Sequence, residues 1–235
     1  MRVDILSLFP DYFRGPFDVS ILKRAREKGL LDIHLVDIRD FAANKHAQKY
    51  AKVDDRPYGG GPGMVLMPEP VCSAIRSMKN EKSHVVYLSP QGQKLTAAKC
   101  EELAQKEHLI LLCGHYEGVD ERALVQEVDE EISIGDYVLT NGCIAAVVVV
   151  DAVARFIPGV LGHEEAALQD SFQEGIFDAP HYTRPEVFEG MAVPAVLKTG
   201  NHAKIKKWRR EQAVAKTQRV RPDLKLLEGD EDETE

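Results

Sequence analysis

The chain has 235 residues, of which 44% are hydrophobic and 29% are charged, and these proportions exclude a chain that is disordered along its whole length. This length suits one large domain, or a main domain with a smaller appendage. The net charge is -8, but residues 228–235 hold six of the 38 acidic side chains, so the rest of the chain carries 30 basic against 32 acidic groups, or -2.

The amino-terminal sequence MRVDILSLFP lacks the basic and long apolar segments of a signal peptide. The longest apolar run is interrupted at Asp151, so we expect a cytoplasmic protein with no membrane segment. The cysteines form no CxxC pair, and we expect reduced core thiols rather than a metal or disulfide site. They are Cys72, Cys100, Cys113 and Cys143.

Strand-like and helix-like segments alternate over the first 155 residues, which is typical of an α/β sheet with crossover helices. Strands are expected at residues 3–8, 33–38, 84–88 and 109–113. Helices are expected between them, at residues 18–29, 68–78 and 96–107, with Asp18 and Thr96 as the N-caps of the first and last.

The run from 132 to 175 contains the features of an active site. Its strand-like start breaks at Gly135 and resumes at residues 137–139, before Asn141-Gly142 turns the chain. An apolar helix then runs from about residue 145 to 157, and Asp151 and Arg155 lie on one of its faces because they are four residues apart. Pro158-Gly159 ends this helix, and the polar loop that follows carries Asp170.

Three glycine-marked loops follow predicted strands, at residues 89–95, 114–122 and 133–142. Ligands bind at the carboxyl ends of strands in open parallel sheets. Backbone groups of these loops could therefore surround a flat heterocycle such as adenine. The alternative is three ordinary turns.

Two further motifs are candidate binding sites, one rich in glycine and one rich in charged side chains. The GGGPG at 59–63 lacks the Lys-Ser/Thr of a phosphate-binding loop, although Arg56, Tyr58 and Gly59 could hold a base or a ribose-phosphate. Here the alternative is a mobile loop that needs positive φ angles. His115, Glu117 and Arg122 form a charged cluster that suits a ligand's amine or sulfonium, or else an ordinary structural salt bridge.

A basic segment near the carboxyl terminus suggests contact with nucleic acid. Residues 198–225 hold ten Lys or Arg against two acidic side chains, around the single Trp208. A solvated amphipathic helix is the alternative interpretation.

Ten short motifs occur in the order found in one enzyme family: SLFP, DDRPYGGGPGM, YLSPQG, CGHYEG, DER, IGDYVL, RFIPGVLG, DSF, HYTRP and GNHAKIKKWR. From residue 1 to about 222 the chain resembles the bacterial tRNA (guanine-N1)-methyltransferases, the TrmD family of the SPOUT superfamily. The resemblance implies a trefoil-knotted α/β fold with a parallel sheet, an exception to the rule against knots. It also implies a homodimer with shared active sites and methylation of guanosine 37 of tRNA.

The resemblance also implies a domain organisation. A knotted methyltransferase domain spans residues 1–159, and a linker that carries the catalytic Asp spans 160–180. A small helical tRNA-binding domain spans 181–227, and the acidic tail spans 228–235. In this family the linker of one subunit completes the cofactor pocket of the other.

Position by position, the resemblance implies roles for particular residues. The catalytic base falls on Asp170 and its supporting arginine on Arg155. The S-adenosylmethionine pocket falls on Tyr87, Leu88, Ser89, Pro90, Gln91, Gly114, Glu117, Ile134, Gly135, Asp136, Tyr137, Val138 and Leu139. Contacts with tRNA fall on His181, Tyr182, Arg184, Asn201, His202, Lys206, Lys207 and Arg209, together with Arg56, Tyr58 and Gly59.

The chain departs from the family where relatives read GGE after the IGDYVL segment, because it has Asn141-Gly142-Cys143. A contact by that Glu side chain is therefore absent. A Leu-Pro that often follows is replaced by Ile144-Ala145, and the C-terminal domain is shorter than in many relatives. The family also suggests a magnesium requirement, although no compact carboxylate cage is evident.

The proton on N1 of guanine must leave before its lone pair attacks a methyl group, so a general base is required, and Asp170 is the candidate. Arg155 either stabilises the charge that builds on O6 or holds Asp170 in place. Two other functions stay open. One is a related SPOUT enzyme with another RNA target, and the other is a non-catalytic RNA-binding protein.

Overall fold

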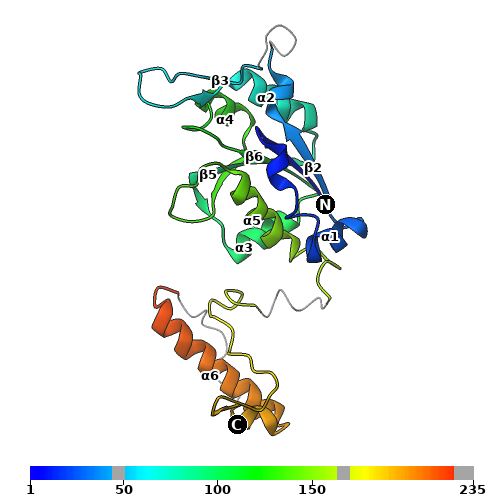
Figure 1. The fold of residues 1–235 in the computed structure, drawn as a ribbon, viewed down its shortest axis with the longest axis vertical. Coiled ribbons are helices and arrows are strands. Elements are labelled where there is room, and N and C mark those ends of the chain that lie inside the picture. Colours follow the sequence, from blue (N-terminus) through cyan, green and yellow to red (C-terminus); the bar gives the residue numbers. More distant parts are fainter. Residues whose placement is uncertain (44–50, 163–169, 225–235) are drawn as a thin grey trace. The chain divides into compact units, whose positions relative to one another are not determined.

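The computed structural model describes residues 1–43, 51–162 and 170–224 (Figure 1). The chain divides into two compact units, residues 1–164 and 165–235, and each is described by itself. This division falls inside the segment expected to be a linker. The expected acidic tail, 228–235, lies outside the described residues.

A parallel sheet forms the centre of the first unit, as the sequence predicts. Its strands are β1 (Arg2–Ser7), β2 (Asp32–Asp37), β5 (Ser83–Lys94), β6 (His108–Cys113) and β7 (Glu130–Ser133). The spatial order is β2-β1-β6-β5-β7, with parallel pairing throughout. Every residue of β6 is buried because helices cover both faces of the sheet.

Two hydrophobic cores lie on opposite faces of this sheet. One core holds α1 (Ser20–Glu27), α3 (Ala97–Ala104) and α5 (Cys143–Ala154), and the other holds α2 (Pro68–Met78) and α4 (Glu121–Glu127). Figure 1 shows α2 and α4 on one side of the strands and α3 and α5 on the other. Short elements complete the unit: η1 (Pro10–Phe13), η2 (Ile38–Phe41), β3 (Asp54–Asp55) and β4 (Val65–Leu66).

Of the two predicted helix N-caps, the structure contains one. Thr96 does cap α3, since its side chain accepts a hydrogen bond from the backbone N–H of Lys99 at 3.2 Å. Asp18 does not cap α1, which begins after Val19 with no side-chain cap. The Asp18 carboxylate instead pairs with Arg26 at 2.6 Å, a charged partner that a local capping pattern does not reveal.

The predicted strand at residues 137–139 is also wrong. Strand β7 ends at Ser133, and Gly135, with a φ of 155°, turns the backbone so that Tyr137 N–H bonds to Gly135 O at 2.9 Å. This turn separates the segment from the sheet. Helix α5 begins at Cys143, two residues before the predicted start, with Gly142 as its N-cap and no side-chain cap. In the turn before it, Asn141 Oδ1 accepts a hydrogen bond from Cys143 N–H at 2.8 Å.

A buried polar network lies at the start of β1 and β6. Asp4 has no exposed surface and accepts hydrogen bonds from Arg2 Nε at 2.9 Å and Nη2 at 2.8 Å. Its other neighbour is His108, whose Nε2 lies 3.0 Å from the Asp4 carboxylate. Ser83 Oγ lies 2.7 Å from the second ring nitrogen of His108, so β1, β5 and β6 are joined by this network.

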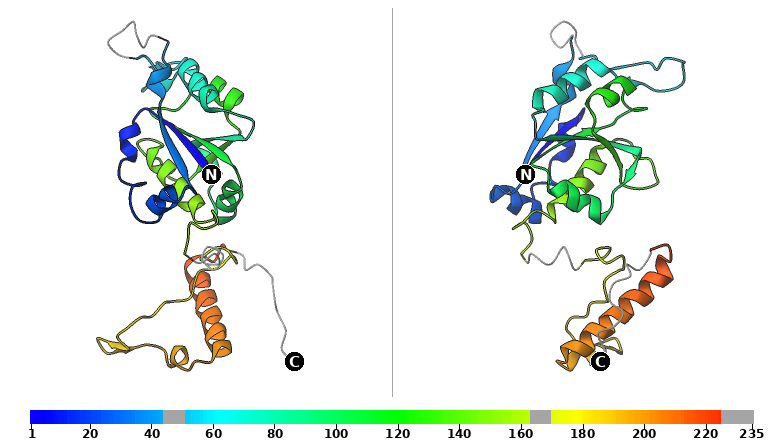
Figure 2. Two further views of the ribbon diagram at one scale, coloured as in Figure 1. Left: turned by 90° about the vertical axis from the view of Figure 1, so that its right-hand side faces the viewer. Right: turned by 180° about the vertical axis from the view of Figure 1, so that it is seen from behind.

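The second unit contains the long helix α6 (His202–Val220), the short helix η4 (Ala195–Lys198) and a hairpin of β8 (Val187–Phe188) and β9 (Met191–Ala192). Figure 2 shows α6 with the non-helical chain of this unit beside it. The domain expected to be helical from residue 181 has no helix before η4 among the described residues. Glu189 and Gly190 have φ angles of 46° and 80°, which suit a tight hairpin turn.

Candidate active site

A pocket lies at the carboxyl ends of β6 and β7 and beside the register shift that interrupts β5 after Leu88. The three glycine-marked segments meet there, although β5 continues to Lys94, so that most of the segment expected to be a loop at residues 89–95 belongs to the strand. The sequence predicts this meeting from the position of the loops after strands. The lining consists of Tyr87, Leu88, Ser89, Pro90, Gly114, His115, Tyr116, Glu117, Gly118, Ile132, Ser133, Ile134, Gly135, Tyr137, Val138, Leu139, Thr140, Asn141, Gly142 and Ala145.

Most of the residues expected to hold a cofactor take part in this lining, whereas Gln91 and Asp136 lie outside it. Asp136 is instead 3.7 Å from Lys94 Nζ. Thr140, Asn141 and Gly142 line the pocket as part of the loop expected at residues 133–142. Ile132 and Ala145 also line it but lie outside the three expected loops, because Ile132 belongs to β7 and Ala145 to α5.

Tyr87 forms the floor of the pocket and is 7% exposed. A Cβ atom added to Gly114 would lie 2.9 Å from Tyr87 Oη, so the glycine lets the chain cross the ring. Burial raises the pKa of Tyr87 to about 12, and the neighbouring carboxylates of Glu131 and Glu121 add to this rise. The ring is therefore a neutral phenol at physiological pH.

A second close backbone approach closes the pocket at Gly142. Its N–H donates to Gly114 O at 2.8 Å, and an added Cβ would lie 2.8 Å from Gly114 N. At the next position, where the chain departs from the family pattern, the Cys143 side chain lies in the core. It is 1% exposed and its Sγ lies 3.2 Å from Ser7 Oγ. The cysteine thus belongs to the core and not to the pocket wall. All four cysteines are free and buried.

The predicted cluster of His115, Glu117 and Arg122 is only partly assembled. His115 and Glu117 line the pocket, but Arg122 does not and pairs with Asp120 at 2.8 Å. The Asp120 carboxylate also caps α4, which explains why it takes the arginine that the sequence associated with Glu117.

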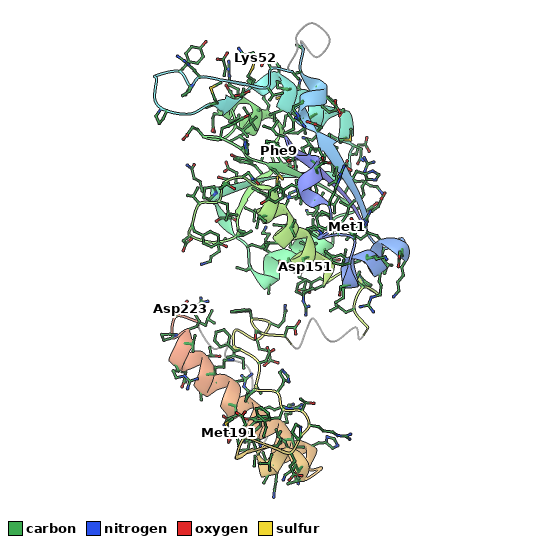
Figure 3. The ribbon with its side chains drawn as sticks, in the orientation of Figure 1. Met1, Phe9, Lys52, Asp151, Met191 and Asp223 are labelled. Carbon is green, nitrogen blue, oxygen red and sulfur yellow. The ribbon has the colours of Figure 1, made fainter. Side chains whose placement is uncertain are left out.

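The His115 ring is packed between aromatic neighbours. Phe9, which Figure 3 labels, lies in the loop after β1 with its ring centroid 5.0 Å from that of His115, and Tyr116 is 4.4 Å away. Burial lowers the pKa of His115, although the charge of Asp54 opposes the shift. Nδ1 of His115 is buried with no hydrogen-bond partner within the described part of the chain.

The loop that carries Arg56, Tyr58 and Gly59 extends into solvent. Tyr58 is 100% exposed, and Arg56 and Gly59 are also exposed. Gly59, Gly60 and Gly61 have φ angles of 85°, 78° and 113°, which L side chains rarely adopt. The glycine run therefore fixes an open loop with an unpacked aromatic ring.

The two candidate catalytic residues belong to different units of the structure. Arg155 is the half-buried C-cap of α5 in the first unit. Asp170 is half-buried in the second unit and begins a compact turn, since Ser171 Oγ donates to Asp178 Oδ1 at 2.6 Å. Phe172, with a φ of 80°, packs edge-on against Phe177 with a centroid distance of 5.5 Å.

The turn that carries Asp170 is fixed to α6. Thr217 is 1% exposed, and its hydroxyl accepts a hydrogen bond from Phe177 N–H and donates one to Ala213 O, both at 2.8 Å. Arg210 forms an ion pair with Glu174 of the same turn. The carboxylate is thus presented by a loop whose geometry α6 holds in place.

The side chains expected to contact tRNA are exposed in the second unit. Asn201 is used structurally, because its side chain caps α6 by accepting from Lys204 N–H at 3.0 Å. Tyr182 is 49% exposed and its ring lies 6.3 Å from that of Trp208. The remaining exposed residues of this set are His181, Arg184, His202, Lys206, Lys207 and Arg209.

Across residues 1–43, 51–162 and 170–224, no three His, Cys, Asp or Glu side chains come together as metal ligands. None of the helices in those ranges is long and apolar enough to cross a membrane.

The chain is similar to known proteins over most of its length. The sequence profile described as tRNA (Guanine-1)-methyltransferase TrmD matches residues 1–226. A tRNA (guanine-N(1)-)-methyltransferase of Protochlamydia amoebophila is 67% identical over 224 residues, which are 95% of this chain and 99% of that protein.

Relatives from Chlamydia are longer. Proteins of the same name from Chlamydia muridarum and Chlamydia pneumoniae are 61% and 60% identical over 226 residues, which are 96% of this chain. The chain spans 63% and 61% of the length of these two proteins.

Proposed function

The chain belongs to the tRNA (guanine-1)-methyltransferase TrmD family, and we propose that it methylates N1 of guanosine 37 in tRNA with S-adenosylmethionine as the methyl donor. The observation that carries the proposal is the pocket that β5 forms with the loops after β6 and β7, in a chain that matches the family over residues 1–226. S-adenosylmethionine, when bound, supplies a methyl group activated by its sulfonium charge.

The pocket has the chemistry that this donor requires. Leu88, Ile134 and Leu139 give apolar walls for a flat base, while the glycines at 114 and 142 let backbone groups approach closely. Glu117 supplies a carboxylate for the cationic end of the donor. The phenol of Tyr87 stays neutral below about pH 12 and adds no charge to the floor.

We propose that two subunits share each active site. Support comes from apolar side chains exposed beside the pocket: Tyr137 is 55% and Val138 82% exposed, and Ile144 and Val148 of α5 are 42% and 39% exposed. Ile144 and Val148 are four residues apart and lie on one helical face. A second copy would cover this surface and bring its own Asp170 to the pocket. Family membership also supports a trefoil knot in the sheet.

In the proposed mechanism Asp170 is the general base. Its carboxylate accepts the proton from N1 of guanine as the methyl group is transferred, a step typically worth about 10² to 10⁴ in rate. The Ser171–Asp178 hydrogen bond and the Thr217 anchor hold the turn from which Asp170 projects. A fixed turn keeps the base in the geometry that proton transfer requires.

Arg155 has two candidate roles at this step. Its guanidinium either stabilises the negative charge that builds toward O6, or orients the Asp170 carboxylate. A double-mutant cycle with Asp170→Asn separates the two roles. An arginine that only orients the Asp170 carboxylate has no further effect once that carboxylate is gone, whereas an arginine that contacts O6 keeps an effect on the rate.

We propose that tRNA binds to the exposed basic face of α6 and to the loop with Arg56, Tyr58 and Gly59. Lys206, Lys207 and Arg209 are exposed and have no ion-pair partner among the described residues, so they are available to phosphates. Tyr58 offers a fully exposed ring on which a base can stack.

The decisive experiment measures methyl transfer from labelled S-adenosylmethionine to tRNA transcripts with and without guanosine at position 37. We expect incorporation only with the guanosine, and 1-methylguanosine as the product on nuclease digestion and mass analysis. Another methylated nucleoside would indicate a related RNA methyltransferase with a different target. Binding of tRNA without binding of S-adenosylmethionine would indicate a non-catalytic RNA-binding protein.

The assignment of the base has its own test. We expect Asp170→Asn to keep the affinity for S-adenosylmethionine while methyl transfer falls by about 10² or more, because the amide cannot accept the N1 proton. Single-turnover rates measure the chemical step, and calorimetry measures the affinity. Turnover at the wild-type rate would remove Asp170 from the mechanism.

A further inference from the structure

The exposed glycine loop and the pocket loop are joined by their backbones. Glu117 N–H donates to Met64 O at 3.0 Å, and Leu66 N–H donates to Gly118 O at 2.9 Å. A third bond runs from Asp120 N–H to Leu66 O at 2.9 Å. The segment that returns from the glycine loop is therefore a fixed neighbour of the pocket wall, and a displacement of one of these segments moves the other.

Gly63 lies where the glycine loop meets this wall. A Cβ atom at Gly63 would lie 2.5 Å from Cγ and 2.8 Å from Cδ of Glu117, and closer still to its carboxylate oxygen. Real Cβ atoms essentially never approach that closely, so either the backbone or the Glu117 side chain would have to move. The α-carbon of Gly63 thus occupies space directly against the Glu117 side chain.

The other glycines of the same run make no such contact. Gly59, Gly60 and Gly61 also have positive φ angles, but nothing lies within 4 Å of a Cβ built on any of them. The GGGPG motif therefore contains two kinds of glycine. Those at 59–61 serve only the backbone turn, and Gly63 in addition packs against a side chain that lines the pocket.

We propose that Gly63 is a positioning residue for Glu117: its missing side chain leaves the space in which the Glu117 carboxylate is held at the cofactor pocket. This inference rests on the proposed function, in which Glu117 contacts the cationic end of S-adenosylmethionine. Any side chain at position 63 displaces that carboxylate and weakens the binding of the methyl donor, even though residue 63 itself does not line the pocket.

The test compares Gly63→Ala with Gly60→Ala, because these two glycines have nearly equal φ angles of 81° and 78°. Both variants place alanine at nearly the same positive φ, and only Gly63→Ala meets Glu117. Affinity for S-adenosylmethionine is measured by calorimetry on the full chain, with thermal unfolding as the check on folding. We expect Gly63→Ala to weaken the affinity by about tenfold, within the range that overpacking produces, and Gly60→Ala to leave it unchanged.

A double-mutant cycle with Glu117→Ala separates positioning from a general loss of structure. Truncation removes Cγ and the carboxylate, so in that background Gly63→Ala meets no obstacle and we expect no further loss of affinity. An additive loss in the double variant, or equal affinities of Gly63→Ala and Gly60→Ala, overturns the proposal.

The proposed function fails in a different way. If the wild-type chain binds S-adenosylmethionine and Glu117→Ala binds it equally well, then Glu117 is not a cofactor ligand, and the inference falls with that assignment. If the wild-type chain does not bind S-adenosylmethionine at all, the proposed activity itself is overturned. A loss in Glu117→Ala that Gly63→Ala does not reproduce refutes the role of Gly63 alone.

Discussion

Replacement of Gly142 by alanine tests how tightly the pocket is built. The φ and ψ of Gly142 are -77° and -3°, a region that alanine adopts freely, so backbone preference alone would make Gly142→Ala stabilising by about 0.4–1 kcal/mol. The added Cβ would however lie 2.8 Å from Gly114 N and 2.9 Å from Cys113 Cα. These are backbone atoms at the end of a buried strand, and they cannot rotate away as a flexible side chain can.

Steric overlap therefore decides the sign of the change. Overpacking of this kind costs about 1–3 kcal/mol, and loss of the hydrogen bond from Gly142 N–H to Gly114 O adds about 1 kcal/mol. After subtraction of the backbone gain, we expect the free energy of unfolding to fall by about 2 kcal/mol. For a unit of this size that corresponds to a fall in Tm of roughly 4–8 °C.

Urea denaturation followed by far-ultraviolet circular dichroism measures this change. Gly162→Ala is the matched control, because nothing lies within 4 Å of its built Cβ and no unusual φ applies there. We expect the control to be as stable as the wild type, or slightly more stable. If Gly142→Ala matches the control, the approach of α5 to β6 is looser than the structure indicates and the argument is refuted.

Three further predictions follow from named residues. The buried phenol of Tyr87 has a pKa of about 12 against an ordinary value of 10, so its contribution to stability is present below pH 10 and is lost as the pH rises toward 12, by roughly 2–3 kcal/mol. Urea denaturation across this pH range should show that loss in the wild type and not in Tyr87→Phe, and an equal loss in both would contradict it. Asp4→Ala should lower the free energy of unfolding by about 3 kcal/mol, since it leaves the buried His108 without its carboxylate, whereas Asp32→Ala at the exposed His34 pair should cost under about 1 kcal/mol. Equal costs for the two variants in denaturant titrations would count against the buried network. Changing Lys206, Lys207 and Arg209 together to alanine should weaken tRNA binding and flatten its dependence on salt, by about one unit of slope for each phosphate that the variant no longer neutralises. An unchanged slope in a filter-binding titration would show that these three side chains are solvated and do not contact phosphates.

Local sequence patterns determined much of the first unit. Because every residue from 109 to 113 is apolar, this segment is expected to be a strand inside a sheet that is covered on both faces, and β6 is fully buried. Pro68 opens α2 and Thr96 caps α3 because both devices act within one turn of helix. The carboxyl ends of parallel strands must share an edge, so the glycine-marked loops could be expected to meet.

Tertiary contacts decided what the patterns left open. Arg122 pairs with Asp120 and not with Glu117, and Asp18 pairs with Arg26 instead of capping a helix, because a charged side chain takes the partner that the folded backbone brings within reach. Residues 137–139 have the composition of a strand, yet the turn at Gly135 leaves them outside the sheet.

The sequence by itself determined the family, the parallel sheet and the loops that carry the pocket, because these depend on periodicity, turn residues and ordered motifs along the chain. Only the tertiary structure shows which glycines pack against the residues that line the pocket. Gly142 against Gly114 and Gly63 against Glu117 are contacts between segments far apart in the chain, and a glycine's missing side chain has a steric meaning only when its neighbours in space are known.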